Sequence, residues 1–389
     1  MNEILILGGG FAGVEAAIKL KKKGHNVTLV SNRDYLFVYP ISIWIPTKKI
    51  KFDDAKIPLA KLQKKHKFNL IIDDVENINA DNKTVTLKTK ELSYDYLIIA
   101  LGMDKRHIDG IEKTLSICGS PKQSLDIQEK LDELIKKGSG KISIGFGVNP
   151  NDPTGSVVRG GPAFELLFNI SNMLKKKKIR DSFELNMFAP MPHPGKKMGE
   201  KAYKNMDRFF EIYKINKHVG KKIVSFTDNE VLFEGGGKLE SDLTIFISGG
   251  EGHHKLKNSK LPINEAGFIC TEPTCQVKEY PEVYAVGDAA HLLGPQWVSK
   301  QGHMAEVMAD VASYNIDQQI KGLNNFKDYI DRVSIICVMD SGNGAAFTKR
   351  TAKKESFMML PIIGHWLKKG WGFYYKNSKL KRIPRIPGM

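Results

Sequence analysis

The chain begins with a short apolar strand that runs directly into a glycine loop. Residues 4–7 form the expected strand, and Gly8, Gly10 and Gly13 follow in a G-x-G-x-x-G pattern. The first glycine permits a tight turn, the second lets a pyrophosphate approach the backbone, and the third lets the next helix pack on the strand. Residues 14–20 have the apolar spacing of that helix, whose N-terminus would face the phosphates. The pattern predicts an α/β domain that binds a dinucleotide; the alternative is a strand-turn-helix unit without a ligand.

The end of the next strand differs from the usual dinucleotide pattern. Residues 26–30 form the expected strand, and Ser31, Asn32 and Arg33 follow it. A carboxylate usually stands at this point and binds the ribose hydroxyls. Because Ser31 and Asn32 can also hydrogen-bond a ribose, we place these three residues in the cofactor site.

A second strand-glycine run occurs in the middle of the chain, but no helix follows it directly. Residues 142–147 end in Gly145 and Gly147, and a segment with two prolines separates them from a helical pattern that starts at Gly160. The next strand, residues 184–190, ends without an acid for a ribose. A pyrophosphate at this loop would lack the adjacent helix N-terminus that normally binds it. The interruption therefore argues against NAD(P)H, although a reshaped NADH loop remains an alternative.

Two more buried strands end in glycine, and together with the first glycine loop they form a set of three motifs. Residues 94–102 end at Gly102, and residues 281–290 contain a short strand that ends in Gly287 and Asp288. With the first glycine loop, and in this order, the motifs resemble the flavoproteins that have two dinucleotide-binding domains. The resemblance implies two Rossmann-like α/β domains, the first of them discontinuous. It also implies FAD, with the pyrophosphate at residues 8–13 and the ribityl chain near Asp288.

The same resemblance implies a role for the segment at residues 298–302, which opens a helix beside the flavin pyrimidine in such proteins. Lys300, next to Gln301, would then stabilise the reduced, anionic flavin together with the helix N-terminus. The alternative for Lys300 is a solvated residue at the start of a helix.

Within the flavoproteins, the run from Gly161 to Glu165 (Gly-Pro-Ala-Phe-Glu) resembles a motif of the sulfide:quinone oxidoreductases, which are related to type II NADH dehydrogenases. Residues 37–40, which end in Pro40, and the positions of Cys118 and Cys337 are also similar to that family. The resemblance implies that sulfide is oxidised at cysteine sulfurs and that electrons pass through FAD to a quinone.

One position departs from the family pattern. The family has a working cysteine just before the Gly-Pro-Ala motif, where this chain has Arg159. Cys337 fits the other member of that pair and Cys118 fits an accessory cysteine. Either Cys118 and Cys337 form a different relay, or the donor is not sulfide. Arg159 would attract an anionic donor and lower a nearby thiol pKa; the alternative is a surface arginine.

Glu165 lies about one turn into the expected helix, beside apolar residues. If burial raises its pKa, its carboxyl group could relay protons to a reduced quinone. The alternative is a charge that interacts with the start of the helix.

Length and composition set the domain plan. The 389 residues exceed one typical domain. We predict an FAD-binding domain from residues 1–115 and 265–350, a second Rossmann-like domain at 116–264, and a C-terminal tail at 351–389.

Four cysteines are too few for a secreted disulfide fold. The Cys270–Cys275 spacing lacks further ligands, so we expect no metal site. We see no secretory signal and no membrane-spanning segment.

The positive charge is concentrated in the tail. Residues 349–389 contain eleven Lys or Arg and one acid, which accounts for +10 of the net charge of +16. Aromatic residues alternate with lysines there, as is typical of a segment in a membrane interface. Gly364, Gly370 and Gly372 argue against one continuous helix. A core-packing segment is the main alternative; we expect no nucleic-acid partner because no nucleic-acid fold motif accompanies the charge.

These features together predict a peripheral, monotopic membrane enzyme that passes electrons from sulfide or a related sulfur donor through FAD to a membrane quinone. The alternatives are a type II NADH:quinone oxidoreductase, a related flavoprotein with a non-sulfide donor, and a non-catalytic flavin-stabilised scaffold. The side of the membrane, the quinone and a homo-oligomeric state are left open.

Overall fold

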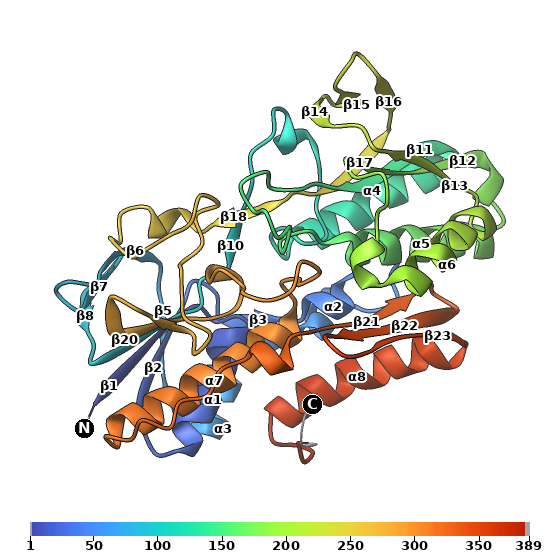
Figure 1. Cartoon of the computed structure of the whole chain (residues 1–389). Helices are drawn as coiled ribbons and strands as arrows, with labels where there is room; N and C mark the ends of the chain where they lie inside the picture. The colour runs from blue at the N-terminus through green and yellow to red at the C-terminus, as the bar shows by residue number, and fades with distance from the viewer. Residues whose placement is uncertain (1, 386–389) are drawn as a thin grey trace.

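A computed structural model describes residues 2–385 of the chain. The described chain is mixed α/β, with two parallel sheets and an antiparallel sheet near the C-terminus (Figure 1). The predicted α/β class is therefore confirmed. Among these residues, no helix combines the length and the apolar character needed to cross a bilayer.

The first parallel sheet carries the first glycine loop. Its strand order is β19-β20-β9-β1-β2-β5, and all neighbours except β19 and β20 run parallel. The strands come from both ends of the sequence, and helices α1 and α7 pack against each other beside them (Figure 1). The bounds are β1 Glu3–Leu7, β2 Asn26–Ser31, β5 Asn69–Ile72, β9 Tyr96–Ile99, β19 Gln276–Val277, β20 Tyr280–Ala285, α1 Phe11–Lys22, α3 Leu59–His66 and α7 Gly302–Ile320.

The second parallel sheet has the order β13-β12-β11-β17. Its central strand β11 is the second strand-glycine run, and the next helix begins only at Gly160, as the sequence predicts. The bounds are β11 Gly140–Phe146, β12 Phe183–Ala189, β13 Ile215–Val219, β17 Leu243–Ile247, α4 Gln123–Lys137, α5 Gly160–Lys176 and α6 Glu200–Ile212.

Small antiparallel elements surround the two parallel sheets. Strands β10 and β18 pair with each other and lie between the two sheets (Figure 1). The bounds are β3 Tyr35–Phe37, β4 Lys56–Pro58, β6 Val75–Asn79, β7 Thr84–Leu87, β8 Glu91–Ser93, β10 Met103–Lys105, β14 Ile223–Phe226, β15 Glu230–Phe233, β16 Lys238–Glu240, β18 Gly250–Gly252 and α2 Tyr39–Ser42.

The C-terminal region is an antiparallel sheet covered by a helix. Strands β21 (Ser334–Asp340), β22 (Gly344–Thr351) and β23 (Glu355–Pro361) pair in sequence order, and α8 (Ile363–Lys379) packs against all three. The domain boundary that we drew after residue 350 therefore falls inside β22, and the division into domains stays a prediction.

The expectation that glycines prevent a continuous helix in the tail is wrong, because α8 contains all three of them. A Cβ at Gly364 would come 2.5 Å from the Cβ of Ala345 on β22, and one at Gly372 would come 2.8 Å from Ile41 of α2. These two glycines let the helix approach its neighbours closely, so tertiary packing outweighs their low helix propensity.

The end of α8 is fixed to the first domain by buried charges. Lys379 contacts the carboxylates of Glu15 on α1, at 2.5 Å, and Glu306 on α7, at 2.6 Å. Arg385 also bonds to Glu15 at 2.6 Å, and the Tyr375 hydroxyl donates to Glu306 at 2.8 Å. Since Glu15 and Lys379 are almost fully buried, the C-terminal helix is an integral part of the fold.

Candidate functional site

A cavity of about 1490 Å³ is lined by the loops at the ends of both parallel sheets. Ligands of open α/β sheets bind outside the carboxyl ends of the strands, which is where this cavity lies. Every residue predicted for the site lines it, with the exception of Gly13. The lining members of that set are Gly8, Gly10, Ser31, Asn32, Arg33, Pro40, Gly102, Cys118, Glu165, Gly287, Asp288, Lys300, Gln301 and Cys337.

The first glycine loop has the geometry of a pyrophosphate cradle. Gly8 has a φ of +112°, and a Cβ there would lie 2.2 Å from the carbonyl oxygen of Ala100. A Cβ at Gly13 would lie 1.8 Å from the Gly8 carbonyl oxygen, so that glycine serves the packing of α1 on β1. By contrast, a Cβ at Gly10 would meet no atom within 4 Å, and Gly10 lines the cavity. The three glycines therefore fit the roles that the sequence pattern assigned to them.

The end of β2 uses its serine to close the turn. The Ser31 hydroxyl donates to the Arg33 carbonyl at 2.7 Å and accepts from the Arg33 N–H at 3.2 Å. Asn32 and Arg33 line the cavity beside it. Two carboxylates that we did not predict, Asp73 and Asp74, follow the neighbouring strand β5 and line the same cavity, and the Asp73 N–H donates to the Ser31 carbonyl at 2.9 Å. They could have been recognised only from the order of the strands, because they follow a strand that pairs with β2.

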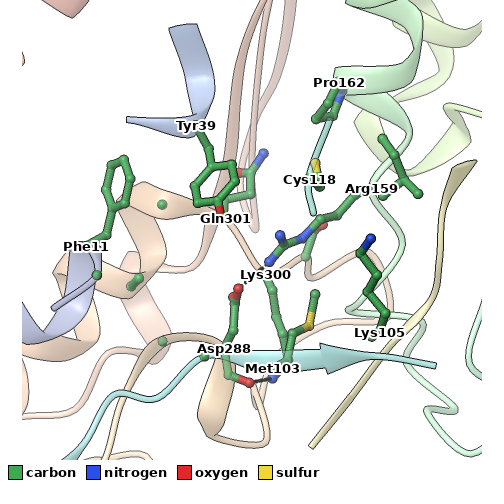
Figure 2. Close-up of a pocket in the computed structure, with 18 of the residues that line it drawn as sticks. Phe11, Tyr39, Met103, Lys105, Cys118, Arg159, Pro162, Asp288, Lys300 and Gln301 are labelled. Carbon is green, nitrogen blue, oxygen red and sulfur yellow. Dashed lines mark hydrogen bonds and ion pairs between the residues drawn. The ribbon is translucent and has the colours of Figure 1, made fainter. Parts of the chain in front are cut away.

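Figure 2 shows an ionic cluster in the middle of the cavity. The Arg159 guanidinium forms an ion pair with Asp288, which follows β20. The Lys300 ammonium donates to the backbone carbonyls of Asp288, at 2.7 Å, and Ala290, at 2.6 Å. Lys300 is 3% exposed, so the alternative of a solvated residue is wrong. Burial lowers the pKa of Lys300 to about 7, and its contacts hold the turn that presents Asp288.

Cys118 lies next to this cluster. Burial raises the pKa of its thiol, while the Arg159 guanidinium, which hydrogen-bonds to it, and Lys105 act in the opposite direction. Arg159 is therefore not a free surface arginine: it contacts Cys118 and Asp288 at once. Its Nε atom is buried without a hydrogen-bond partner among residues 2–385, which leaves a donor available for a ligand.

Cys337 lies on β21 opposite the start of α5. A Cβ at Gly161 would come 3.7 Å from its sulfur. Burial, together with the nearby Glu165 carboxylate, raises the pKa of this thiol to about 12. Gln301, the residue before α7, accepts a hydrogen bond from the Ile336 N–H at 3.2 Å and so connects α7 to this strand. All four cysteines of the chain carry free thiols.

Glu165 is paired with a residue that the sequence did not reveal. It is 5% exposed, and Lys368 of α8 contacts its carboxylate. Burial raises the pKa of Glu165 to about 7, against the opposing effect of Lys368. The alternative of a helix-start charge is wrong because the carboxylate is engaged in the interior. Lys368 lines the cavity too, but it lies 203 residues away in sequence, and nothing in its local pattern marks it.

The second glycine loop satisfies its own polar groups. The Asp152 carboxylate accepts from the Val157 N–H at 3.1 Å and from the Ser156 hydroxyl at 3.0 Å. The Lys197 ammonium donates to the carbonyls of Gly155, at 2.8 Å, and Thr154. Phosphates at such loops use backbone N–H groups. Here the Val157 N–H of the loop already donates to the Asp152 carboxylate.

Comparison with known proteins gives consistent matches over most of the chain. The sequence profile of the family described as pyridine nucleotide-disulphide oxidoreductase matches residues 2–309. A sulfide-quinone reductase of Aquifex aeolicus is 27% identical over 372 residues, which cover 89% of this chain and 83% of that protein. A type II NADH:quinone oxidoreductase of Staphylococcus aureus is 21% identical over 389 residues, covering 93% of this chain and 94% of that protein.

The fold has solved counterparts as well. The crystal structure of the sulfide:quinone oxidoreductase from Aquifex aeolicus superposes with a TM-score of 0.89 at 23% identity, covering 98% of this chain and 92% of that one. The resemblance that the motifs indicated is thus confirmed, at the level of sequence and of fold.

Proposed function

This chain belongs to the pyridine nucleotide-disulphide oxidoreductase family and is an oxidoreductase enzyme, and from that premise we propose that it passes electrons from sulfide, or a related sulfur donor, through FAD to a membrane quinone. Family membership implies a flavin, and the glycine cradle supports FAD as its form. Gly8 and Gly10 would lie against the pyrophosphate, Gly13 would let α1 pack close to β1 behind it, and Asp288 would hold the ribityl chain. When bound, the flavin supplies a two-electron carrier between the donor and the quinone.

The observation that carries the proposal is the position of the two thiols. Cys118 and Cys337 line the same cavity as the glycine cradle, whereas Cys270 and Cys275 do not. Sulfide oxidation at a cysteine needs a thiol beside the electron acceptor, and a cation that favours the thiolate makes the sulfur more nucleophilic. Burial raises the pKa of the Cys118 thiol, and the Arg159 guanidinium acts against that rise.

Arg159 also bears on the identity of the donor. It stands where the family resemblance expects a cysteine, and it cannot carry sulfur itself. A relay must therefore use Cys118 and Cys337, or the donor is an anion other than sulfide that the guanidinium attracts. The ion pair with Asp288 and the unpaired Nε of Arg159 both support a role in the cavity rather than on the surface.

The second loop argues against a nicotinamide nucleotide. The Asp152 carboxylate already accepts from the Val157 N–H, and its negative charge would repel a phosphate bound at this loop. The Lys197 ammonium is already engaged with carbonyls of the loop and with the Val298 carbonyl at 3.3 Å. These contacts support a donor other than NADH.

Glu165 and Lys368 are the residues best suited to protonate the quinone. Reduction of a quinone to a quinol consumes two protons, and a general acid is most effective when its pKa is near the working pH. With its pKa raised to about 7, Glu165 holds a proton in part of the molecules at neutral pH. Lys368 stabilises the carboxylate that remains after the proton leaves.

An apolar surface around α8 supports attachment to a membrane. Large apolar side chains of β23, α8 and the residue between them are at least 47% exposed there, and Lys369 lies over the ring of Trp366 at 5.2 Å. Such a mixture of aromatic, aliphatic and basic groups suits the headgroup layer of a bilayer. The apolar members are Met358, Met359, Ile362, Ile363, Trp366, Leu367 and Phe373.

The decisive experiment is an anaerobic reduction of the purified yellow protein. We expect sulfide to bleach the flavin absorbance and NADH to leave it unchanged. The substitution Cys270→Ser is the matched control, because Cys270 does not line the cavity and its loss should leave bleaching intact. Bleaching by NADH but not by sulfide would overturn the proposal.

That last result would identify the second candidate, a type II NADH:quinone oxidoreductase. The match to the staphylococcal protein over 93% of this chain favours it. In that case Lys196 and Lys197, which line the cavity beside the second loop, would be the cations for the nucleotide phosphates.

A further inference from the structure

Two neighbouring histidines and an aspartate come together where the chain passes between the two parallel sheets. Asp104 lies in the middle of β10, and His253 and His254 directly follow β18, the strand that pairs with β10 (Figure 1). One potential ligand atom from each of the three side chains lies within 4.8 Å of the other two. All three residues line the cavity, and none of them has a role in the electron path described above.

The backbone explains why both histidine rings lie on one side of the chain. Neighbouring residues of a strand point to opposite faces, but β18 ends at Gly252 and the chain turns into a short 3₁₀ helix of which His253 is the N-cap. In this turn the two rings stack, with centroids 4.5 Å apart. The antiparallel pairing of Met103 with Gly252 places Asp104 next to the turn.

The carboxylate of Asp104 is already oriented toward one of the histidines. Its Oδ2 atom accepts from the His254 backbone N–H at 2.7 Å and lies 2.8 Å from the Nδ1 atom of the same residue. Two ligand atoms at this separation can both bind one ion at about 2.1 Å, because the separation is smaller than twice that bond length. The backbone N–H would stay on the carboxylate, since ligating carboxylates are usually hydrogen-bonded as well.

His253 supplies the third lone pair. Its Nδ1 atom accepts from the Lys255 backbone N–H at 3.3 Å. A ring nitrogen that accepts a hydrogen bond is unprotonated, which is the form in which histidine binds metals. Because this hydrogen bond is long, an ion could replace it at little cost. The His254 side chain is 59% exposed, so its ring can turn toward the ion.

The charges on this part of the chain favour a cation. Glu251 stands directly opposite Asp104 in the β10–β18 ladder, and opposite residues project from the same face of a sheet. Lys105, the next residue of β10, projects from the other face, where its ammonium donates to Gln123 at 3.1 Å. Two carboxylates therefore lie on the face of Asp104, and Lys255, which follows the histidines, is the cation that opposes them.

We propose that Asp104, His253 and His254 form a binding site for a divalent transition metal of the zinc class. Two imidazoles and one carboxylate suit Zn²⁺, Co²⁺ or Ni²⁺, whereas Ca²⁺ and Mg²⁺ prefer oxygen ligands alone. Three protein ligands leave a fourth position for water or a small anion, and this position is reached from the cavity that the three residues line. The site is independent of the proposed function, because an ion binds without turnover. The expectation of no metal site considered the cysteines, and Asp104 and His254 are 150 residues apart in sequence.

Calorimetric titration of the metal-free holoenzyme with Zn²⁺ tests the site. We expect the wild type to bind one ion per chain, and His254→Ala and Asp104→Asn to bind it at least about tenfold more weakly. His254 is exposed enough for its loss to leave the core intact, and flavin absorbance checks that each variant is folded. His107→Ala is the matched control, because His107 also lies beside a carboxylate, that of Asp109 at 3.5 Å, but no third ligand joins this pair among residues 2–385.

Thermal unfolding gives a second readout. Zn²⁺ should raise the unfolding midpoint of the wild type and of His107→Ala more than that of His254→Ala, since a ligand that binds only the folded state stabilises it. If Zn²⁺ binds instead at the thiols of Cys118 and Cys337, His254→Ala and Asp104→Asn will retain wild-type affinity. That result, an absence of saturable binding to the wild type, or an equal loss of affinity in His107→Ala would overturn the inference.

Discussion

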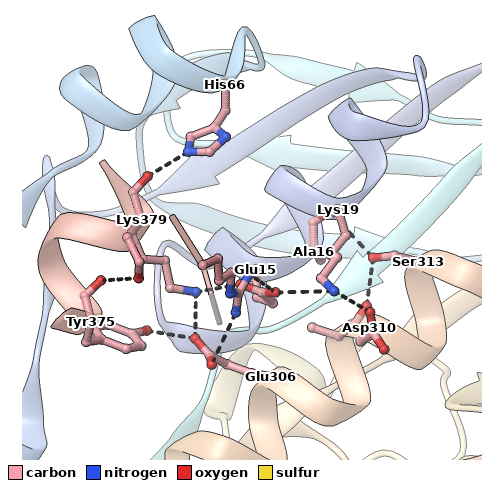
Figure 3. A network of polar contacts seen from close by, with 12 residues as sticks. Glu15, Ala16, Lys19, His66, Glu306, Asp310, Ser313, Tyr375 and Lys379 are labelled. Carbon is pink, nitrogen blue, oxygen red and sulfur yellow. Dashed lines mark hydrogen bonds and ion pairs between the residues drawn. The ribbon is translucent and has the colours of Figure 1, made fainter. Parts of the chain in front are cut away.

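The buried ion-pair cluster that fixes α8 makes a quantitative prediction about Glu15 (Figure 3). Burial alone would raise the pKa of Glu15, but Lys379 and Arg385 lower it from 4.5 to about 2. A pKa lowered by this much corresponds to about 3 kcal/mol in favour of the ionised, folded form. We therefore expect Glu15→Gln to reduce the free energy of unfolding at neutral pH by about 3 kcal/mol, in line with the removal of one partner from a buried pair.

Thermal unfolding of the holoenzyme, followed by circular dichroism, measures this effect. With an unfolding entropy of about 2 cal/mol/K for each of the 389 residues, a loss of 3 kcal/mol lowers the midpoint by about 4 °C. Because the pKa is lowered in the folded state, the stabilisation is complete above pH 4.5 and is lost as the pH falls toward 2. The difference between the variant and the wild type should shrink over that range.

The matched control is Glu133→Gln. Glu133 forms a 2.8 Å ion pair with Lys130, but both side chains are more than half exposed, so we expect a change of less than about 1 °C. If Glu15→Gln melts within about 1 °C of the wild type, the cluster does not stabilise the fold and the argument from burial and charge is refuted.

Three further predictions test the site and the surface. Gly10→Val should place atoms in the pyrophosphate cradle and yield protein with little bound flavin; a full flavin complement measured by absorbance would remove Gly10 from the cradle. Cys337→Ala should abolish sulfide oxidation while retaining FAD, and unchanged turnover would exclude this thiol from the mechanism. Trp366→Ser combined with Phe373→Ser should reduce binding to anionic vesicles in a flotation assay without loss of flavin, whereas undiminished binding would mean that another surface attaches the chain.

The first glycine loop could be predicted from sequence because its spacing pattern is local. Gly8 has a positive φ, and a Cβ at Gly13 would meet the Gly8 carbonyl oxygen within the same loop. The contact that a Cβ at Gly8 would make with Ala100, which follows β9, could not be read from that segment. The interruption after β11 could be predicted for the same reason, since prolines and a missing helical pattern are visible in the segment itself. What could not be predicted was that Asp152 and Lys197 satisfy this loop internally, because Lys197 comes from a distant segment.

The C-terminal region was harder to predict because its structure depends on contacts between distant parts of the chain. Helix α8 needs glycine at positions 364 and 372 because Ala345 and Ile41 leave no room there for a larger side chain, and its packing outweighs their low helix propensity. Glu165 could be identified from its motif, but its partner Lys368 lies 203 residues away and is an ordinary charged residue in its own segment. Local propensity cannot report such a pair, whose stability arises only when the two helices meet.

Helix α8 fixes how far the glycine loop at the start of α1 lies from the exposed aromatic surface. On one face, Tyr375 stacks on Phe11, the first residue of α1, with ring centroids 5.1 Å apart, and on Trp371 at 5.2 Å. On the other face Trp366 and Phe373 are exposed. Because both faces belong to one helix, the exposed aromatic surface is held at a fixed distance from the glycine loop.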